Sequence, residues 1–413
     1  MIDRYKNATL TQIWSEEAKL LRWLDIVTVW AKERGDNQVY ADLKTHRKTL
    51  DAFLFREEVE REEVATNHDV AAFIDVVARR LGAPTDLLLA YGLTSSDLVD
   101  TGMMIACRDS LELTHRNLIE FMDKISAMAR THAATICVGR THGQPADLTT
   151  FGHKMATFYY DLTFVRDSMK RHMRGIGMLG MLSGPVGSHT YAPESVAKRA
   201  LADLNVTPIP IASQVISRVP VAMLVQDLAL LSGVLSKWAI NFRLLMQAEI
   251  GELILSKGSA EKGSSSMPHK TNPAGLEKIT GLHRLVEGYS RAVSDGIQLW
   301  GERDISHSSV ERIAIPDAFH AVANQLRTFH NTLDNLKVNT LRMQGEAEEC
   351  PNSHWMIHEL IDTAQMAQRS GRTRAGYYEK ARNVERYGSV GIQEWWVNVG
   401  DIMTHRINVV TTL

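Results

Sequence analysis

The segment from Gly263 to Asn272 holds the residue types best suited to chemistry. It reads GSSSMPHKTN, so hydroxyls, an imidazole and an ammonium group lie close together in the chain. Asn272 suits a helix N-cap and Pro273 the first helical position, so a helix should begin there. Lys270 and the hydroxyls would then lie near the positive end of that helix, where a carboxylate or phosphate is stabilised. Such surroundings, once closed to water, can activate a serine as a base, although composition alone equally fits a solvated Gly/Ser linker.

Three further segments are rich in polar side chains that could do chemistry. They are Leu93–Asp100 (LTSSDLVD), Gly139–Gly152 (GRTHGQPADLTTFG) and Leu299–Arg312 (LWGERDISHSSVER). An imidazole suits proton transfer at neutral pH, which makes His142 a candidate, although a lone loop histidine is more often structural. The guanidinium of Arg303 could bind a phosphate bidentately, although arginines taken alone are more often partners in surface ion pairs.

Long helices must position these segments. Eleven prolines are spread over 413 residues, and none occurs between Pro220 and Pro268 or between Pro273 and Pro316. Proline breaks helix interiors, so such gaps permit very long helices. Apolar residues recur at helical spacing, and alternating strand patterns are nearly lacking. The sequence therefore predicts an all-α protein built on a bundle of long helices. The periodic residues are Leu111, Leu118, Met122, Ile125 and Ala129, and Leu224, Leu228, Leu231, Leu235, Trp238, Phe242 and Leu245.

The four segments together resemble the fumarase/aspartase superfamily. GSSSMPHKTNP resembles its signature, G-S-x-x-M-x-x-K-x-N, and the other blocks follow in the order of that superfamily. Their wording is most similar to the adenylosuccinate lyase family, as are the opening MIDRYKNATLTQIWSEEAKLLRWL and the block NHDVAAF. The resemblance covers residues 1 to about 340. It implies β-elimination that releases fumarate from adenylosuccinate, giving AMP, and from the succinylated aminoimidazole carboxamide ribotide of purine biosynthesis.

The resemblance also assigns catalytic roles residue by residue. Ser264 matches the general base that removes the Cβ proton, and His142 matches the general acid at the leaving nitrogen. His68 matches a histidine that supports this acid, and Glu277 a carboxylate that orients it, although Glu277 also fits an ordinary first-turn acid. Lys270 matches a residue that holds the succinyl carboxylates and stabilises the developing charge.

The implied substrate contacts lie in the same blocks and at the N-terminus. Hydroxyls would hold a succinyl carboxylate, an amide would contact the substrate, and arginines would reach the nucleotide phosphate. These residues are Arg4, Tyr5, Thr94, Ser95, Ser96, Thr141, Gln214, Asn272, Arg303, Ser308 and Arg312. The family implies no metal and no organic cofactor.

Two departures from the family pattern concern the substrate side. Ala90 stands where H-Y-G-x-T-S has a histidine, and Val219, Pro220 and Val221 replace aspartate, arginine and histidine after Arg218. A second hypothesis therefore keeps the chemistry but takes a modified purine-like succinyl nucleotide as substrate. A third, from another class, is a non-catalytic structural protein of the same fold, which would need neither Ser264 nor His142.

Composition and charge exclude some classes of partner. The formal net charge is -2, which argues against general binding to nucleic acid or to a membrane surface. The three cysteines are far apart and not in metal-ligand spacing, so a reducing, cytoplasmic location is expected. The N-terminal residues have no apolar secretory region. Charged and polar residues interrupt the most apolar stretch, Val219–Met246, which therefore reads as a buried helix rather than a membrane span.

The expected organisation has three domains. Residues 1–92 would form an N-terminal helical domain, residues 93–340 the central bundle with the signature loop, and residues 341–413 a short C-terminal helical domain. Apolar residues on more than one helix face need a partner. The family implies a homotetramer with a helical core and active sites assembled from three subunits.

Overall fold

The computed structural model describes residues 1–82, 91–175, 179–256, 267, 270–350 and 401–412. It is mainly helical, which confirms the all-α prediction. The chain divides into two compact units, each made of three chain segments. Unit 1 comprises Met1–Leu118, Val165–Leu235 and Lys278–Arg327, and unit 2 comprises Ile119–Phe164, Ser236–Glu277 and Thr328–Leu413. The three sequence-contiguous domains expected above remain a prediction.

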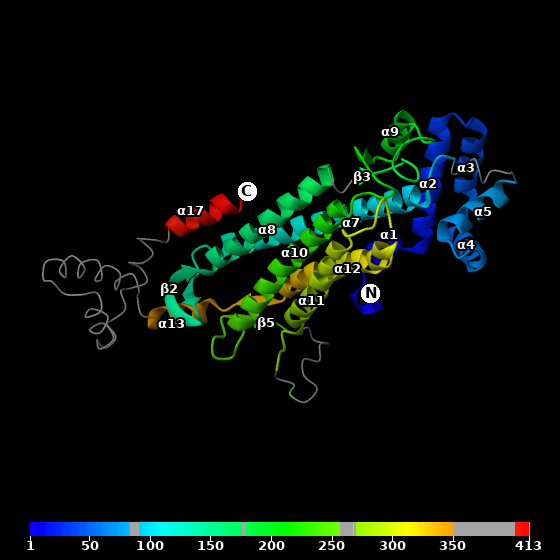
Figure 1. Ribbon diagram of the computed structural model, residues 1–413. Coiled ribbons are helices and arrows are strands. Elements are labelled where there is room, and N and C mark those ends of the chain that lie inside the picture. The colour runs from blue at the N-terminus through cyan, green and yellow to red at the C-terminus, as the bar shows by residue number, and fades with distance from the viewer. Residues whose placement is uncertain (83–90, 176–178, 257–266, 268–269, 351–400, 413) are drawn as a thin grey trace, which may run out of the picture. The chain divides into compact units, whose positions relative to one another are not determined.

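Short helices form the first part of unit 1 (Figure 1). Large aromatic side chains such as Trp23, Trp30 and Phe73 are almost fully buried among them. Several of these helices begin at a side-chain cap, because Asn7, Ser15, Asp51 and His68 each accept a hydrogen bond from a backbone N–H of the first turn. The elements of this first part are η1 (Asp3–Tyr5), α1 (Ala8–Ile13), α2 (Glu16–Arg34), α3 (Asn37–Thr49), α4 (Ala52–Thr66) and α5 (Asp69–Leu81). The second chain segment of unit 1 adds α9 (Glu194–Asp203) and the parallel pair β3 (Leu179–Gly180) and β4 (Thr207–Pro208).

Five long helices contribute residues to both units. They are α7 (Ser95–Thr131), α8 (Phe151–Arg174), α10 (Arg218–Leu245), α11 (Ala274–Asp295) and α12 (Ser306–Asp334). The periodic apolar residues expected on α7 and α10 are buried, apart from Leu245, which is partly exposed. Pro316 lies inside α12, so one proline gap ends within a helix and not at its boundary.

Unit 2 has an aromatic core and two small sheets. Phe158 stacks on Trp238 at a centroid distance of 4.7 Å, and Phe121, Phe242 and Phe329 pack around them. An antiparallel hairpin joins β1 (Ile136–Thr141) to β2 (Gln144–Thr150). A second antiparallel pair joins β5 (Leu253–Leu255) to β6 (Leu336–Val338). The remaining described helices are α13 (Thr340–Glu349) and α17 (Asp401–Val410).

Among the described helices, α10 is long and apolar enough to cross a membrane by length and composition. However, 61% of its apolar window is buried within the protein. A helix that is hydrophobic around most of its circumference is typical of a buried core. This burial agrees with the interpretation of Val219–Met246 as a core helix.

Candidate functional site

The turn that carries His142 is a tight hairpin turn in unit 2. Thr141 pairs with Gln144, so His142 and Gly143 are the two residues of the loop. Their φ angles are 53° and 77°, the left-handed pair that a two-residue type I′ hairpin turn requires. Asparagine, aspartate and histidine tolerate this conformation better than most residues other than glycine. His142 is exposed at the tip of the hairpin.

An ion pair with a buried carboxylate begins two residues before this turn. Arg140 Nη1 donates to Glu252 Oε1 at 2.7 Å, and the Glu252 side chain is fully buried. Glu252 precedes β5, whereas Arg140 lies on β1. Burial raises the pKa of the neighbouring Cys137 thiol to about 11, so that side chain stays neutral.

The segment leading into α11 lies in the same unit. The helix begins at Ala274, one residue later than expected, with Asn272 and Pro273 just before it. Glu277 is in its first turn, and its carboxylate lies 3.6 Å from the guanidinium of Arg243. Lys270 is exposed before the helix, while Ser264 lies outside the described residues.

A cleft of about 510 Å³ opens beside this segment. Arg243, Thr271, Pro273 and Glu277 contribute to its wall, and the remaining lining is mainly apolar. An apolar cleft with a few charged groups is typical of a small-molecule site. It therefore places the predicted residue Glu277 at a concave surface.

In unit 1, the predicted carboxylate-binding residues form the N-terminus of α7. Thr94 precedes the helix, and Ser95 and Ser96 are its first residues. Asp97 is buried and accepts three backbone hydrogen bonds, from Thr94 N at 2.7 Å, Ser183 N at 2.8 Å and Gly184 N at 3.2 Å. Burial outweighs these donors and raises the pKa of Asp97 to about 6.

His68 and Ser95 meet in this unit. Ser95 Oγ lies 3.3 Å from His68 Nε2, while His68 Nδ1 accepts the backbone N–H of Ala71 at the start of α5. Half of the His68 side chain is exposed. Two predicted site residues from distant blocks are thus within hydrogen-bond distance.

Gln214 and Arg303 are a second pair of predicted residues in contact. Arg303 Nη1 donates to Gln214 Oε1 at 3.0 Å, and Gln214 Nε2 donates to the carbonyl of Pro185 at 2.9 Å. Arg303 therefore bonds another residue that is expected to contact the substrate. An arginine taken alone would more often form a surface ion pair.

Arg312 does form an ion pair, with Asp69 Oδ2 at 2.7 Å, and also donates to Ser308 Oγ at 3.2 Å. Its side chain is 55% exposed and so remains accessible to a phosphate. At the N-terminus, Arg4 is exposed and Tyr5 is partly exposed, and the Tyr5 carbonyl accepts a hydrogen bond from Asn324 at 3.3 Å.

Sequence reasoning missed a buried ion cluster in unit 1. Arg218 bonds both Asp100 and Glu311, and Asp100 also accepts the N–H of Ile216 at 2.9 Å. Burial raises the pKa of Glu311 to about 7 despite its partner Arg218. A signal existed, because Asp100 and Glu311 belong to LTSSDLVD and ISHSSVER, but a linear motif does not show which residues pair.

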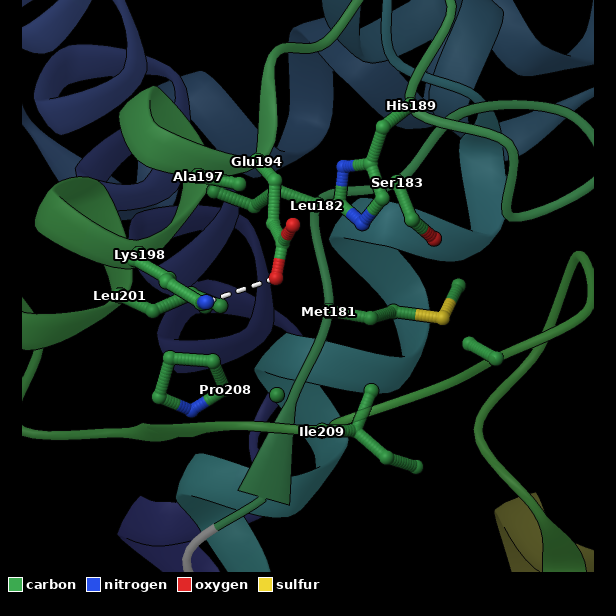
Figure 2. A pocket seen from close by; sticks show the side chains of 12 residues that line it. Met181, Leu182, Ser183, His189, Glu194, Ala197, Lys198, Leu201, Pro208 and Ile209 are labelled. Carbon is green, nitrogen blue, oxygen red and sulfur yellow. Dashed lines mark ion pairs between the residues drawn. The ribbon is translucent and has the colours of Figure 1, made fainter.

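The small pocket in Figure 2 is a different feature of unit 1. Its volume is about 20 Å³, enough for roughly one water molecule. Ser183 and His189 point into it, and Glu194 and Lys198 form a largely exposed ion pair at its edge, 2.7 Å apart. The predicted site residues do not line this pocket, and its size rules out a nucleotide. In the described part of the chain, no group of three or more His, Cys, Asp or Glu side chains could hold a metal ion.

Comparisons with known proteins define the class. A family model described as lyase matches residues 20–288, and the chain belongs to this lyase family, within the fumarase/aspartase superfamily. Its relatives include the adenylosuccinate lyase of Aquifex aeolicus (strain VF5), 35% identical over 84% of this chain and 80% of that protein. The adenylosuccinate lyase of Thermotoga maritima is 33% identical, over 83% of this chain and 79% of the relative. That of Staphylococcus saprophyticus is 35% identical, over 82% and 78%.

Solved structures share the fold. A fumarate lyase from Mesorhizobium sp. BNC1 matches with a TM-score of 0.78 and 21% identity, over 100% of this chain and 95% of that one. The 3-carboxy-cis,cis-muconate lactonizing enzyme from Pseudomonas putida matches with a TM-score of 0.79 and 21% identity, over 99% and 97%. At this identity the likeness establishes the architecture alone.

Proposed function

We propose that the protein catalyses β-elimination of fumarate from adenylosuccinate to leave AMP, and likewise cleaves the succinylated aminoimidazole carboxamide ribotide. The observation that carries this proposal is the identity of 33–35% to adenylosuccinate lyases over most of both chains. The motif blocks of this sequence retain every residue type that the elimination requires. Such a role belongs to purine nucleotide biosynthesis.

The proposed reaction breaks one C–N bond and forms one C=C bond. Ser264 takes the Cβ proton, the electron pair forms the double bond of fumarate, and His142 gives a proton to the departing nitrogen. Charge builds up on the succinyl carboxylate as the Cβ proton leaves. Lys270 and Asn272 stabilise this charge by donating hydrogen bonds to the carboxylate.

Supporting groups orient the reactants. Glu277 and His68 hold the acid imidazole in its working orientation, and the hydroxyls and N–H groups at Thr94–Ser96 bind the other succinyl carboxylate. The exposed guanidinium of Arg312 suits the phosphate, because an arginine fork bonds phosphate oxygens in pairs. The remaining proposed substrate contacts are Arg4, Tyr5, Thr141, Gln214, Arg303 and Ser308.

We also propose a cytoplasmic homotetramer. Large apolar side chains are exposed on α8, α10 and α11, including Phe164 (62%), Leu230 (59%) and Leu285 (47%). Exposed apolar helix faces of this kind favour burial against further copies of the chain. The three cysteines are far apart in the chain, and this spacing supports a reducing compartment. Mass measured in solution tests the tetramer, and a monomer at working concentration would contradict it.

Ultraviolet-monitored turnover of adenylosuccinate tests the proposed activity. Purified protein should convert adenylosuccinate to AMP with stoichiometric release of fumarate, and should do the same with the succinylated ribotide. Protein that is folded but releases no fumarate from either compound would refute it. Loss of activity in Ser264→Ala and in His142→Ala separates catalysis by this chain from a contaminant, and unchanged activity in either variant would overturn the catalytic assignment.

A second substrate is favoured by one specific observation. Val219 is 45% exposed in the first turn of α10, and Val221 is buried, where the family pattern has polar residues. Ala90, the other departure, lies outside the described residues. An apolar surface here would suit a modified purine-like succinyl nucleotide. Turnover of succinylated purine analogues beside adenylosuccinate decides between them, and equal or better turnover of adenylosuccinate would remove this alternative.

A further inference from the structure

The hairpin that carries His142 needs an anchor. A two-stranded hairpin is marginally stable by itself in water. Its turn residues, His142 and Gly143, are exposed, as are Thr141 and Gln144 beside them. A general acid must nevertheless be held at a defined position, because small displacements from the reactive geometry slow the reaction strongly.

Arg140 provides a connection at the base of the turn. The pairing register shifts between Gly139 and Arg140, and such a bulge redirects the side chain that follows. The guanidinium is 15% exposed, donates to Glu252 Oε1 at 2.7 Å, and lies 3.5 Å from Glu346 Oε2. Arg140 is two residues before His142, so its side chain fixes the strand next to the acid.

Glu252 is itself held rigidly. Its carbonyl accepts the N–H of Asn339 at 2.9 Å, and the Asn339 side chain donates to the carbonyl of Gly251 at 3.1 Å. The next residues form β5, which pairs with β6 in an antiparallel register. One ion pair therefore joins the strand before the proposed acid to the residue that immediately precedes β5.

The burial of this pair makes it sensitive to change. Glu252 has a side-chain exposure of 0%, and its Oε2 atom has no hydrogen-bond partner among the described residues. Within that part of the chain, Arg140 is the cation at ion-pair distance from this carboxylate. Removal of Arg140 leaves the buried carboxylate of Glu252 without its cation, whereas removal of Glu252 leaves Arg140 beside Glu346. Replacement of both partners of a buried pair by apolar groups of similar volume is often tolerated.

We propose that Arg140 and Glu252 are positioning residues for the elimination, which keep the strand before His142 at a fixed position relative to β5. The inference rests on the proposed function. If the two residues position His142, substitutions in the pair must change kcat separately from the free energy of unfolding, because a purely structural ion pair would alter both quantities together.

The test compares single and paired substitutions in the full-length protein. Glu252→Gln should lower kcat by about 10- to 100-fold, in keeping with a displacement of roughly 1 Å, and should change KM by less than about threefold. The limb of the kcat–pH profile that reports the acid should shift, because the surroundings of His142 change. Arg140→Lys keeps the charge without the planar fork and should retain an intermediate kcat.

The paired variant Arg140→Met with Glu252→Leu separates the two roles. It should regain much of the unfolding midpoint that either single variant loses, yet kcat should stay low. A kcat that returns together with stability would overturn the proposal, as would a wild-type kcat in Glu252→Gln. This comparison remains informative even if Glu252→Gln fails to fold.

A matched control uses another ion pair of unit 2. Lys124 contacts Asp334, a pair that is partly exposed and includes neither Arg140 nor Glu252. Asp334→Asn should leave kcat, KM and the pH profile unchanged. The wild type is assayed first with adenylosuccinate, so that an inactive wild type counts against the proposed function and an active wild type with active Glu252→Gln counts against the positioning role.

Discussion

The N-terminus of α7 in unit 1 and the hairpin turn in unit 2 differ in how they are held. At α7, the buried carboxylate of Asp97 accepts three backbone N–H groups, one from the nearby Thr94 and two from the distant residues Ser183 and Gly184. At the hairpin, His142 is exposed and its position depends on Arg140, which reaches a distant carboxylate. Damage to the α7 segment should therefore reduce stability first. Damage at the turn tip should reduce activity while leaving the fold intact.

The largest effect is expected for His142→Asn. Asparagine tolerates the positive φ at this position but cannot donate a proton as imidazole does. Loss of a general acid lowers kcat by about 10²- to 10⁴-fold. The unfolding midpoint should stay close to that of the wild type, because the side chain is exposed. Steady-state kinetics and thermal unfolding measure both quantities.

His330→Asn serves as the control for this variant, since His330 is a partly exposed histidine on α12 in the same unit. It should leave kcat unchanged. A large fall in the unfolding midpoint of His142→Asn would contradict the separation of activity from stability at the turn.

Next in size is the effect of Asp97→Ala on stability. The change leaves the N–H groups of Thr94, Ser183 and Gly184 without their acceptor, and each buried unpaired donor costs about 1–3 kcal/mol. We expect the free energy of unfolding to fall by about 3 kcal/mol or more and KM to rise, because Thr94–Ser96 lose their position. Chemical denaturation monitored by circular dichroism measures the first effect.

The exposed Asp123, also on α7, offers the matched substitution. Asp123→Ala should change the free energy of unfolding by less than about 0.5 kcal/mol. Equal losses in the two variants would show that the three hydrogen bonds of Asp97 do not distinguish this end of the helix.

Sequence alone predicted the helices better than the contacts of the site. Long apolar repeats such as Leu224, Leu228 and Leu231 determine a helix face locally, and the structure buries them as expected. The hairpin at GRTHGQPADLTTFG was missed, because its turn uses a histidine at positive φ in place of the usual Asn-Gly pair.

Pairs that are distant in the chain were also beyond reach. The family resemblance assigned Gln214 and Arg303 individually, and the structure adds that they bond each other. Neither the Arg140–Glu252 pair nor the role of Arg218 has a local signature, since each depends on which helices and strands the fold brings together. Placement of the proposed catalytic residues in their roles remains a prediction.

A smaller effect should follow from Arg312→Gln. The guanidinium is half-exposed and pairs with Asp69, so its loss should change the free energy of unfolding by less than about 1 kcal/mol. If it binds the phosphate, loss of a charge-assisted contact raises KM by about tenfold or more. Arg291→Gln is the control, because Arg291 is 81% exposed and pairs with Asp295 on α11. An unchanged KM for adenylosuccinate in Arg312→Gln would remove this residue from the phosphate site.

The smallest effect concerns the pH dependence of stability at Asp97. Burial raises its pKa from 3.8 to about 6, so the folded protein binds a proton between these pH values more readily than the unfolded chain does. This contribution to stability is complete below about pH 4 and is lost as the pH rises through 6. Between pH 7 and pH 5, the wild type should gain about 1 kcal/mol relative to Asp97→Asn, which cannot titrate at that position.

The measurement is the difference in free energy of unfolding between wild type and Asp97→Asn at each pH. Taking a difference removes the contribution of Glu311, whose pKa burial raises to about 7 in the same unit and which both proteins retain. A difference that stays constant from pH 5 to pH 7 would mean that the three N–H donors keep Asp97 ionised throughout. An ionised carboxylate would then hold the α7 segment, as an ion pair holds the hairpin. The two regions would differ only in how exposed their predicted site residues are.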